Sequence, residues 1–225
     1  MSEAKRSGRQ ARQIERAKKG GGMGRPYIVR NIPTYDILAE DSLQKVERAA
    51  DRILAETGIE FRDDPETLSL WRAAGAKVEG VLVKFEPGML REVLKTAPAE
   101  FTQHARNPAN SVRIGGKNVV FAPSYGSPFV MDLDRGRRFG TLEDFRNFIM
   151  LAQSSPNFHH SGGTICEPTD IAVNKRHLDM VLAHMELSDR CYMGSVTHQS
   201  RAEDNIEMSR ILFGADFVEQ NCVIL

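Results

Sequence analysis

The feature that most constrains the fold is a strand–loop–helix pattern that repeats from residue 118 onward. Apolar, strand-like runs recur there, at 118–122, within 158–165, at 191–196 and from Val218 or Cys222. Each of the first three runs leads into an amphipathic helical pattern, so strand starts recur every 30 to 40 residues. This is the spacing of βα units joined by right-handed crossovers, and it predicts an α/β fold.

Local motifs indicate where the helices of these units begin. Thr-Leu-Glu-Asp at 141–144 resembles a capping box, and Ser-Arg-Ala-Glu at 200–203 fits the S-x-x-E form of that motif. Gly214 is placed to end the last of these helices. The middle helix is expected to pack an apolar stripe of Leu178, Val181, Leu182 and Met185.

Two closures of the sheet remain open, a doubly wound sheet and a (β/α)8 barrel. No G-x-G-x-x-G follows the first strand, so nothing supports a dinucleotide-binding sheet. A barrel needs eight units, and this chain holds three and part of a fourth. We therefore predict that residues 118–225 are the first part of a TIM barrel, truncated within its fourth unit.

Residues 26–117 are predicted to form a mostly helical N-terminal region with short strands. One helix follows an Asp41-Ser42 cap and ends at Gly58; a second starts at Asp64-Pro65; a third follows Pro87. Short strands are expected around 81–85, 101–105 and 112–114.

Residues 1–25 hold eight Lys/Arg against two Glu, a net charge of +6, whereas the remainder holds 22 basic and 28 acidic residues, a net of −6. This basic tail, which ends near three consecutive glycines, is predicted to be disordered; contact with nucleic acid or an acidic partner is the alternative. The N-terminus has no apolar signal region, no run of about 18 apolar residues occurs, and the three cysteines are widely spaced. These features predict a cytoplasmic protein with reduced thiols.

The segment 121–141, FAPSYGSPFVMDLDRGRRFGT, is the strongest candidate for a functional loop. It runs from the end of the first strand through a Ser/Tyr/Gly/Pro turn and a predicted hairpin about 134–136 to a helix cap. Loops at the carboxyl ends of strands are where α/β folds place their active sites.

Three runs, the first of which overlaps this segment, carry a family resemblance: APSYGSPFVMDLDRGRRFGTLEDF (122–145), CEPTDIAVNKRHLDM (166–180) and CYMGSVTHQSRAEDNIEMSRILFG (191–214). With ILAETGIEF (53–61) and LWRAAGA (70–76), they resemble the trimethylamine methyltransferase family, collinearly from Arg25 onward. The resemblance implies a TIM barrel of about twice this length that moves a methyl group from an amine to the cobalt of a separate corrinoid protein.

The same resemblance sets the expected partners. It implies a small methylated amine as substrate, either trimethylamine or a quaternary amine such as betaine, and a corrinoid carried by a partner protein rather than bound by this chain. The archetypal enzymes carry pyrrolysine in the later half of the barrel, beyond Leu225. No nucleic-acid or membrane partner is expected, and a homo-oligomer is left open.

A methylated ammonium calls for aromatic faces and carboxylates in its pocket. Tyr125 and Phe129, in the first βα loop, and Glu167, after the second strand, are therefore candidate substrate-binding residues. The structural alternatives are that Tyr125 covers the barrel rim and that Phe129 packs the hairpin. Asp170 is expected to cap the helix over 173–187 instead.

Histidines supply the remaining candidates. On a strand, one of His159 and His160 points inward, and His159 joins the substrate-binding set with His198, which follows the third strand. No H-E-x-x-H or C-x-x-C spacing supports a metal site. His177 and His184 are expected at the solvent edge of a helix.

The remaining residues singled out receive structural roles. Cys191 and Cys222 are expected to be small buried hydrophobes, and Asp132 to pair with Arg137 or Arg138. Ser124, Gly126 and Gly162-Gly163 are expected either to let the backbone approach a ligand closely or to turn tightly.

The resulting prediction is a corrinoid-dependent amine methyltransferase whose catalytic residues are not identified in this chain. The alternative is a non-catalytic or incomplete fragment of such a barrel. Its open sheet edge and uncovered apolar face would then need the missing C-terminal half or a partner chain.

Overall fold

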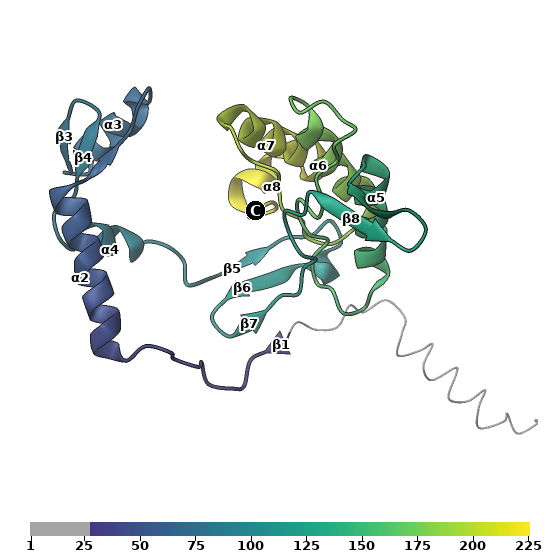
Figure 1. Ribbon diagram of the computed structural model, residues 1–225, viewed down its shortest axis with the longest axis horizontal. Coiled ribbons are helices and arrows are strands. Elements are labelled where there is room, and N and C mark those ends of the chain that lie inside the picture. The colour runs from purple at the N-terminus through teal and green to yellow at the C-terminus, as the bar shows by residue number, and fades with distance from the viewer. Residues whose placement is uncertain (1–27) are drawn as a thin grey trace, which may run out of the picture. The chain divides into compact units, whose positions relative to one another are not determined.

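The computed structural model describes residues 28–225 and divides them into two compact units (Figure 1). The N-terminal unit is Asn31–Ala99, and the C-terminal unit comprises residues 28–30 and 100–225. The basic tail predicted for residues 1–25 lies outside the described residues. None of the helices within 28–225 is long and apolar enough to span a bilayer.

The N-terminal unit packs three helices with a small antiparallel sheet. Its elements in order are α2 (Glu40–Glu56), β2 (Ile59–Glu60), α3 (Pro65–Ala73), β3 (Lys77–Glu79), β4 (Leu82–Lys84) and α4 (Met89–Leu94), and the strand order is β2-β4-β3. The Trp71 ring lies edge-on to Phe85 at 4.8 Å, inside a core that includes Leu68 and Val83. The three predicted helices are confirmed. The predicted Asp41-Ser42 cap is wrong, because Ala39 is the N-cap and both residues lie inside the first turn of α2.

Antiparallel pairs form the regular sheets of the C-terminal unit. They are β1 (Ile28–Val29) with β7 (Asn118–Val119), β5 (Glu100–Gln103) with β6 (Val112–Gly115), and β8 (Phe129–Asp132) with β9 (Gly136–Phe139). The last pair is the predicted hairpin, and Gly136 takes the positive φ of 66° that its turn requires. A short 3-10 turn, Pro108–Asn110, precedes β6.

Helices α5 (Leu142–Ser154), α6 (Arg176–Leu187), α7 (Gln199–Phe213) and α8 (Ala215–Gln220) complete this unit. Helix α5 packs against α6, and α6 against α7, over a core that contains Phe145, Ile149 and Met180 (Figure 1). Fully burying a side chain such as Phe145 contributes about 1.5–3 kcal/mol. The capping box at Thr141 is confirmed, with Asp144 as its partner.

Near the C-terminus, one predicted helix start is wrong, and one of the two predicted strand starts is confirmed. Helix α7 begins at Gln199 with His198 as its N-cap, so the motif at 200–203 lies inside the helix rather than at its cap. Val218 does not start a strand, because it lies in α8; the strand-like pairing begins at Cys222.

The predicted parallel strands appear as isolated bridges. Parallel bridges join Ser127 to Cys166, His160 to Cys191, Tyr192 to Ile224 and Gln103 to Cys222. At 118–119 the chain pairs antiparallel with β1 instead, because the ladder bonds of these residues go to Ile28 and Val29. The α/β class is confirmed as a mixed fold with small antiparallel sheets, and residues 28–225 contain no closed barrel.

Candidate functional site

Loops of the C-terminal unit meet at the turn formed by residues 160–164. The N–H of Gly126 donates to the carbonyl of Thr164 over 2.7 Å, and the N–H of Met193 donates to the carbonyl of Gly162 over 2.9 Å. The turn therefore ties the first candidate loop to the segment that follows Cys191.

His159 and His160, at the start of this turn, are both buried. His159 accepts a 3.0 Å hydrogen bond from the N–H of Phe121 through Nδ1, and the two rings stack at 5.8 Å. His160 accepts from the N–H of Gly162 over 2.9 Å. Burial, and then the neighbouring His184, lower the pKa of His160 to about 3, so this ring is neutral at physiological pH.

Tyr125 lies against the turn with much of its ring open to solvent. The side chain is 61% exposed, and its Cε2 atom lies 3.0 Å from the point that a Cβ on Gly163 would occupy. Glycine at 163 therefore provides the space that the tyrosine ring occupies, and the φ of +100° at Gly162 fits the predicted tight turn. An exposed aromatic face can contact a cation.

Phe129 packs within the hairpin that carries it. Its ring lies 4.8 Å from that of Phe139, and the Arg137 guanidinium sits 3.6 Å above its centroid. One face of Phe129 is thus already in a cation–π contact. These contacts agree with the structural alternative, in which Phe129 packs the hairpin. A role for Phe129 in substrate binding stays a prediction.

The two acidic residues after the second bridged segment have different partners from one another. Glu167 is part-exposed and pairs with Arg176 at 3.0 Å. Asp170 was predicted to cap the following helix, and this is wrong, because Lys175 is the N-cap of α6. Instead, Asp170 accepts a 2.9 Å bond from the N–H of Leu142 and so caps α5.

His198 serves as the N-cap of α7 while remaining exposed. Its Nδ1 accepts from the N–H of Ser200 over 3.2 Å and lies 3.0 Å from the hydroxyl of the same residue. This local bond satisfies one free N–H of the helix start. A substrate contact would have to use the other ring nitrogen.

The prediction that His177 and His184 lie at a solvent edge is wrong. Both are almost fully buried, because α6 is covered on one side by the 160–164 turn and on the other by α7. His177 reaches Asp204 of α7 at 2.7 Å, and His184 contacts Ser161 and Gly163. Hydropathy patterns treat histidine as polar and so miss such a position.

Charge pairing fixes the hairpin to the start of α5. Arg138 donates to Asp132 over 3.0 Å, which confirms one of the two predicted pairings, and to Asp144 over 2.7 Å. The bond to Arg138 holds the pKa of Asp144 well below its usual range. This network is a structural support for the candidate loop.

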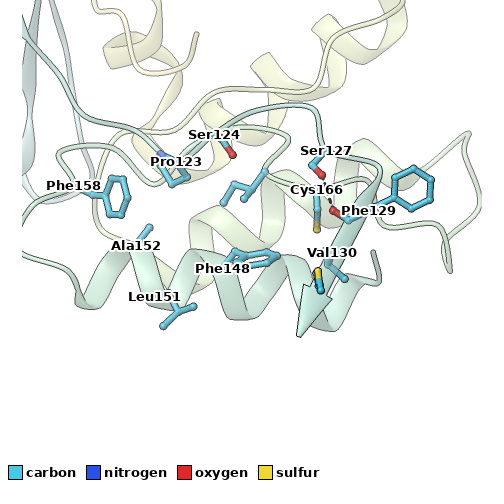
Figure 2. Close-up of a pocket in the computed structure, with 12 residues that line it drawn as sticks. Pro123, Ser124, Ser127, Phe129, Val130, Phe148, Leu151, Ala152, Phe158 and Cys166 are labelled. Atoms are coloured by element: carbon cyan, nitrogen blue, oxygen red, sulfur yellow. Dashed lines mark hydrogen bonds between the residues drawn. The ribbon is translucent and has the colours of Figure 1, made fainter. Parts of the chain in front are cut away.

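An apolar cavity of about 410 Å³ lies between α5 and the hairpin, and the sequence patterns did not predict it (Figure 2). The sequence offered one sign of this cavity: Leu151 is apolar but falls outside the apolar stripe of α5. In the structure Leu151 is 63% exposed. Tyr125, Glu167, His159 and His198 do not line this cavity. Its walls are Pro123, Ser124, Ser127, Phe129, Val130, Met131, Phe148, Leu151, Ala152, Phe158, Ile165 and Cys166.

All three cysteines are free thiols. Burial raises the pKa of Cys166, which faces the cavity, to about 11 and that of Cys191 to about 12. Both thiols are therefore protonated and poor nucleophiles at neutral pH. Cys191 fits the predicted buried hydrophobe, whereas Cys222 is only part-buried. Within residues 28–225, no three His, Cys, Asp or Glu side chains are grouped to hold a metal ion.

Comparison with known proteins extends the sequence resemblance. The chain is 48% identical over 195 residues to the glycine betaine methyltransferase of Desulfitobacterium hafniense, an alignment that covers 86% of this chain and 40% of that protein. It is 27% identical over 128 residues to an L-carnitine:corrinoid methyltransferase of Eubacterium limosum, covering 57% of this chain and 26% of the relative. A proline betaine:corrinoid methyltransferase of the same organism is 28% identical over 150 residues, covering 65% and 30%.

The chain thus spans 40% or less of the length of each of these relatives. Residues 5–225 match the trimethylamine methyltransferase (MTTB) family, including most of the basic N-terminal segment. By this match, which covers nearly its whole length, the chain belongs to the trimethylamine methyltransferase family.

Proposed function

We propose that this chain is the N-terminal part of a corrinoid-dependent methyltransferase that demethylates a quaternary amine, with glycine betaine as the first candidate. The observation that carries the proposal is the 48% identity to a glycine betaine methyltransferase over 86% of the chain. The two more distant relatives are named for carnitine and proline betaine. All three substrates combine a quaternary ammonium with a carboxylate, which favours this class over trimethylamine.

The reaction transfers a methyl group from nitrogen, which keeps the bonding electron pair and leaves as a neutral tertiary amine. A reduced corrinoid on a partner protein supplies the nucleophile when the two proteins meet. The task of this chain is then to bind and orient the ammonium and to exclude water. No proton needs to move, because the quaternary nitrogen is already positively charged.

Tyr125 is the residue of this chain that we assign to the ammonium. The residue is 61% exposed, and its ring lies against a turn that backbone hydrogen bonds tie to two other segments. A cation–π contact of this kind contributes about 0.5–2 kcal/mol. Phe129, Glu167, His159 and His198 remain proposed substrate-binding residues; the first two already have Arg137 and Arg176 as partners.

We also propose that the bridged segments belong to a (β/α)8 barrel that begins at residue 118 and follows a separate N-terminal region at 26–117. Apart from the bridge of Gln103 to Cys222, the parallel bridges join successive segments in chain order, and helices α5, α6 and α7 separate those segments. This is the order expected for adjacent strands of a barrel. The three free cysteines support the further proposal of a cytoplasmic location.

The test is methyl transfer by the full-length protein that contains this chain. Purified protein is mixed with reduced corrinoid protein and with glycine betaine, carnitine, proline betaine or trimethylamine, and methyl-cobalamin is followed by absorbance. The proposal expects the fastest transfer from glycine betaine. Transfer from trimethylamine alone would refute the substrate class, and no transfer from any of the four would refute the activity.

A second candidate is that the 225-residue chain alone is an inactive fragment that needs the remainder of the barrel. The open apolar cavity and the exposed Met131 and Leu151 beside it favour this reading. Size-exclusion chromatography of the isolated chain separates the two cases. A compact, non-associating and active monomer would refute the fragment reading.

A further inference from the structure

The turn on which Tyr125 rests has no room for side chains. A Cβ on Gly162, whose φ is +100°, would lie 2.9 Å from Ile165, and a Cβ on Gly163 would lie 2.9 Å from the Cβ of Met193. Real Cβ atoms essentially never approach other atoms so closely. The position of the Gly163 peptide therefore determines where the Tyr125 ring can lie.

His184, on α6, binds the carbonyl of Gly163, which also accepts a 2.9 Å bond from the N–H of Ile165. Its Nε2 atom lies 3.0 Å from the carbonyl oxygen of Gly163, and its Nδ1 atom lies 2.9 Å from the hydroxyl of Ser161. A carbonyl only accepts, so Nε2 carries the proton and donates it. Nδ1 is then the acceptor for the single hydroxyl proton of Ser161. The Cys191 carbonyl, 3.0 Å from the same hydroxyl, already accepts from the Ser161 N–H over 2.9 Å. Both hydrogen bonds are thus made by one tautomer of the neutral ring.

Neighbouring rings hold the imidazole in this orientation. Phe145 of α5 meets it edge-on at 5.3 Å, and Tyr192 stacks on it at 5.9 Å. The side chain is 1% exposed, and its burial lowers the pKa to about 4, so the ring stays neutral. Few rotamers are open to a ring packed on two sides with both nitrogens bonded.

We propose that His184 is a positioning residue of the ammonium site assigned to Tyr125: by holding the Gly163 carbonyl, it fixes the turn that supports the Tyr125 ring. The role of Tyr125 as the ammonium contact rests on the proposed function. The link from His184 through Gly163 to Tyr125 rests on the contacts above. The two statements are therefore tested by separate measurements.

The kinetic test compares His184→Phe with His184→Gln in the full-length enzyme. Phenylalanine keeps a ring between Phe145 and Tyr192 but loses both hydrogen bonds, whereas glutamine can still donate to Gly163. His184→Phe is expected to raise KM for glycine betaine about 2- to 30-fold, the range of a lost cation–π contact, with a smaller change in kcat. His184→Gln should restore most of the affinity.

A double-mutant cycle identifies the route of the effect. In a Tyr125→Leu background, His184→Phe should cause no further rise in KM, because the group it positions is gone. Additive effects on KM, or an unchanged KM in folded His184→Phe, would overturn the proposal. If His184→Phe fails to fold, Ser161→Ala takes its place, with a smaller rise in KM that also vanishes in the Tyr125→Leu background.

A second measurement does not depend on methyl transfer. With 3-fluorotyrosine incorporated, the 19F resonance of Tyr125, assigned by Tyr125→Phe, should shift and broaden in His184→Phe but not in His184→Gln. Tyr35, in the other compact unit, is the unaffected control. An unchanged Tyr125 signal in His184→Phe would refute the positioning role even if the unsubstituted enzyme is active. A changed signal, together with no methyl transfer by the unsubstituted enzyme, would refute only the proposed function.

Discussion

Arg190 provides the sharpest test of what holds the C-terminal unit together. Its side chain is 8% exposed, and its guanidinium donates to backbone carbonyls at the end of α5 and just beyond it. The acceptors are the carbonyl oxygens of Ala152 at 2.8 Å, Gln153 at 3.1 Å, Ser155 at 2.9 Å and Phe158. One cation thus binds four carbonyls at and just beyond the end of α5 and places positive charge at the negative end of the helix.

Replacing Arg190 by methionine keeps much of its length but removes all four donors. Each unsatisfied buried carbonyl costs about 1–3 kcal/mol, and water that enters the site recovers part of this. We expect a net loss of about 3–5 kcal/mol, the part of the cost of four such carbonyls that water does not recover. Lysine should lose less, because its ammonium keeps a charge but cannot reach four divergent acceptors.

Urea denaturation can assign this loss to one unit. Trp71 is the only tryptophan and lies in the N-terminal unit, so its fluorescence reports that unit, whereas far-UV circular dichroism reports both. For a denaturant slope of about 2 kcal/mol per molar, the Arg190→Met midpoint of the C-terminal unit should fall by about 2 M. The control is Arg146→Met, which removes an exposed pair with Glu186 and should change stability by less than about 1 kcal/mol. A loss below about 1 kcal/mol in Arg190→Met would refute the reasoning.

Three further predictions concern the supports of the candidate loop. Because Arg138 lowers the folded-state pKa of Asp144, the stability from this pair is present above the unfolded pKa of about 4 and falls as the pH drops below it. In Asp144→Asn, the melting temperature should lose this part of its pH dependence. An unchanged pH profile would contradict the pairing. Asp170→Ala should destabilise the C-terminal unit by about 1 kcal/mol, because the first N–H of α5 loses its acceptor; an unchanged stability in denaturation would refute this role. Burial raises the pKa of Cys166 to about 11, so Cys166 should resist iodoacetamide in the native protein while the part-buried Cys222 reacts first. Mass spectrometry that shows the reverse order would contradict this burial.

Some features set by neighbours in sequence were predictable, although the local motifs at 41–42 and 200–203 misplaced two helix starts. Features set by distant partners were not predictable. The capping box at Thr141 needs only Asp144, three residues on, and it was predicted correctly. Asp170 looked like a cap for the helix that follows it, but the N–H that it satisfies belongs to Leu142, 28 residues earlier. The same limit explains His184, whose burial depends on Ser161 and Gly163 from another segment.

The parallel strands show a further limit of sequence patterns. Apolar runs at 158–165 and 191–196 marked the correct segments and their order, since bridges form at His160 and Cys191. A run of apolar residues cannot show how many ladder bonds form, because that number depends on both neighbouring strands. Glycines at 162 and 163 interrupt the second run, and one of them takes a φ of +100° that regular strands do not use.

Charge pairing near the proposed pocket restricts how a cationic substrate can be recognised there. Arg137 covers a face of Phe129, and Arg176 holds Glu167. A quaternary ammonium has no N–H, so it cannot replace the hydrogen bonds of the arginine that it would displace from Glu167. Tyr125 keeps 61% of its surface exposed, and a cation–π contact needs only the open face of the ring. Recognition by this part of the chain should therefore favour a fully methylated nitrogen over a protonated amine, because the methylated cation gives up fewer hydrogen bonds to water when it reaches the ring.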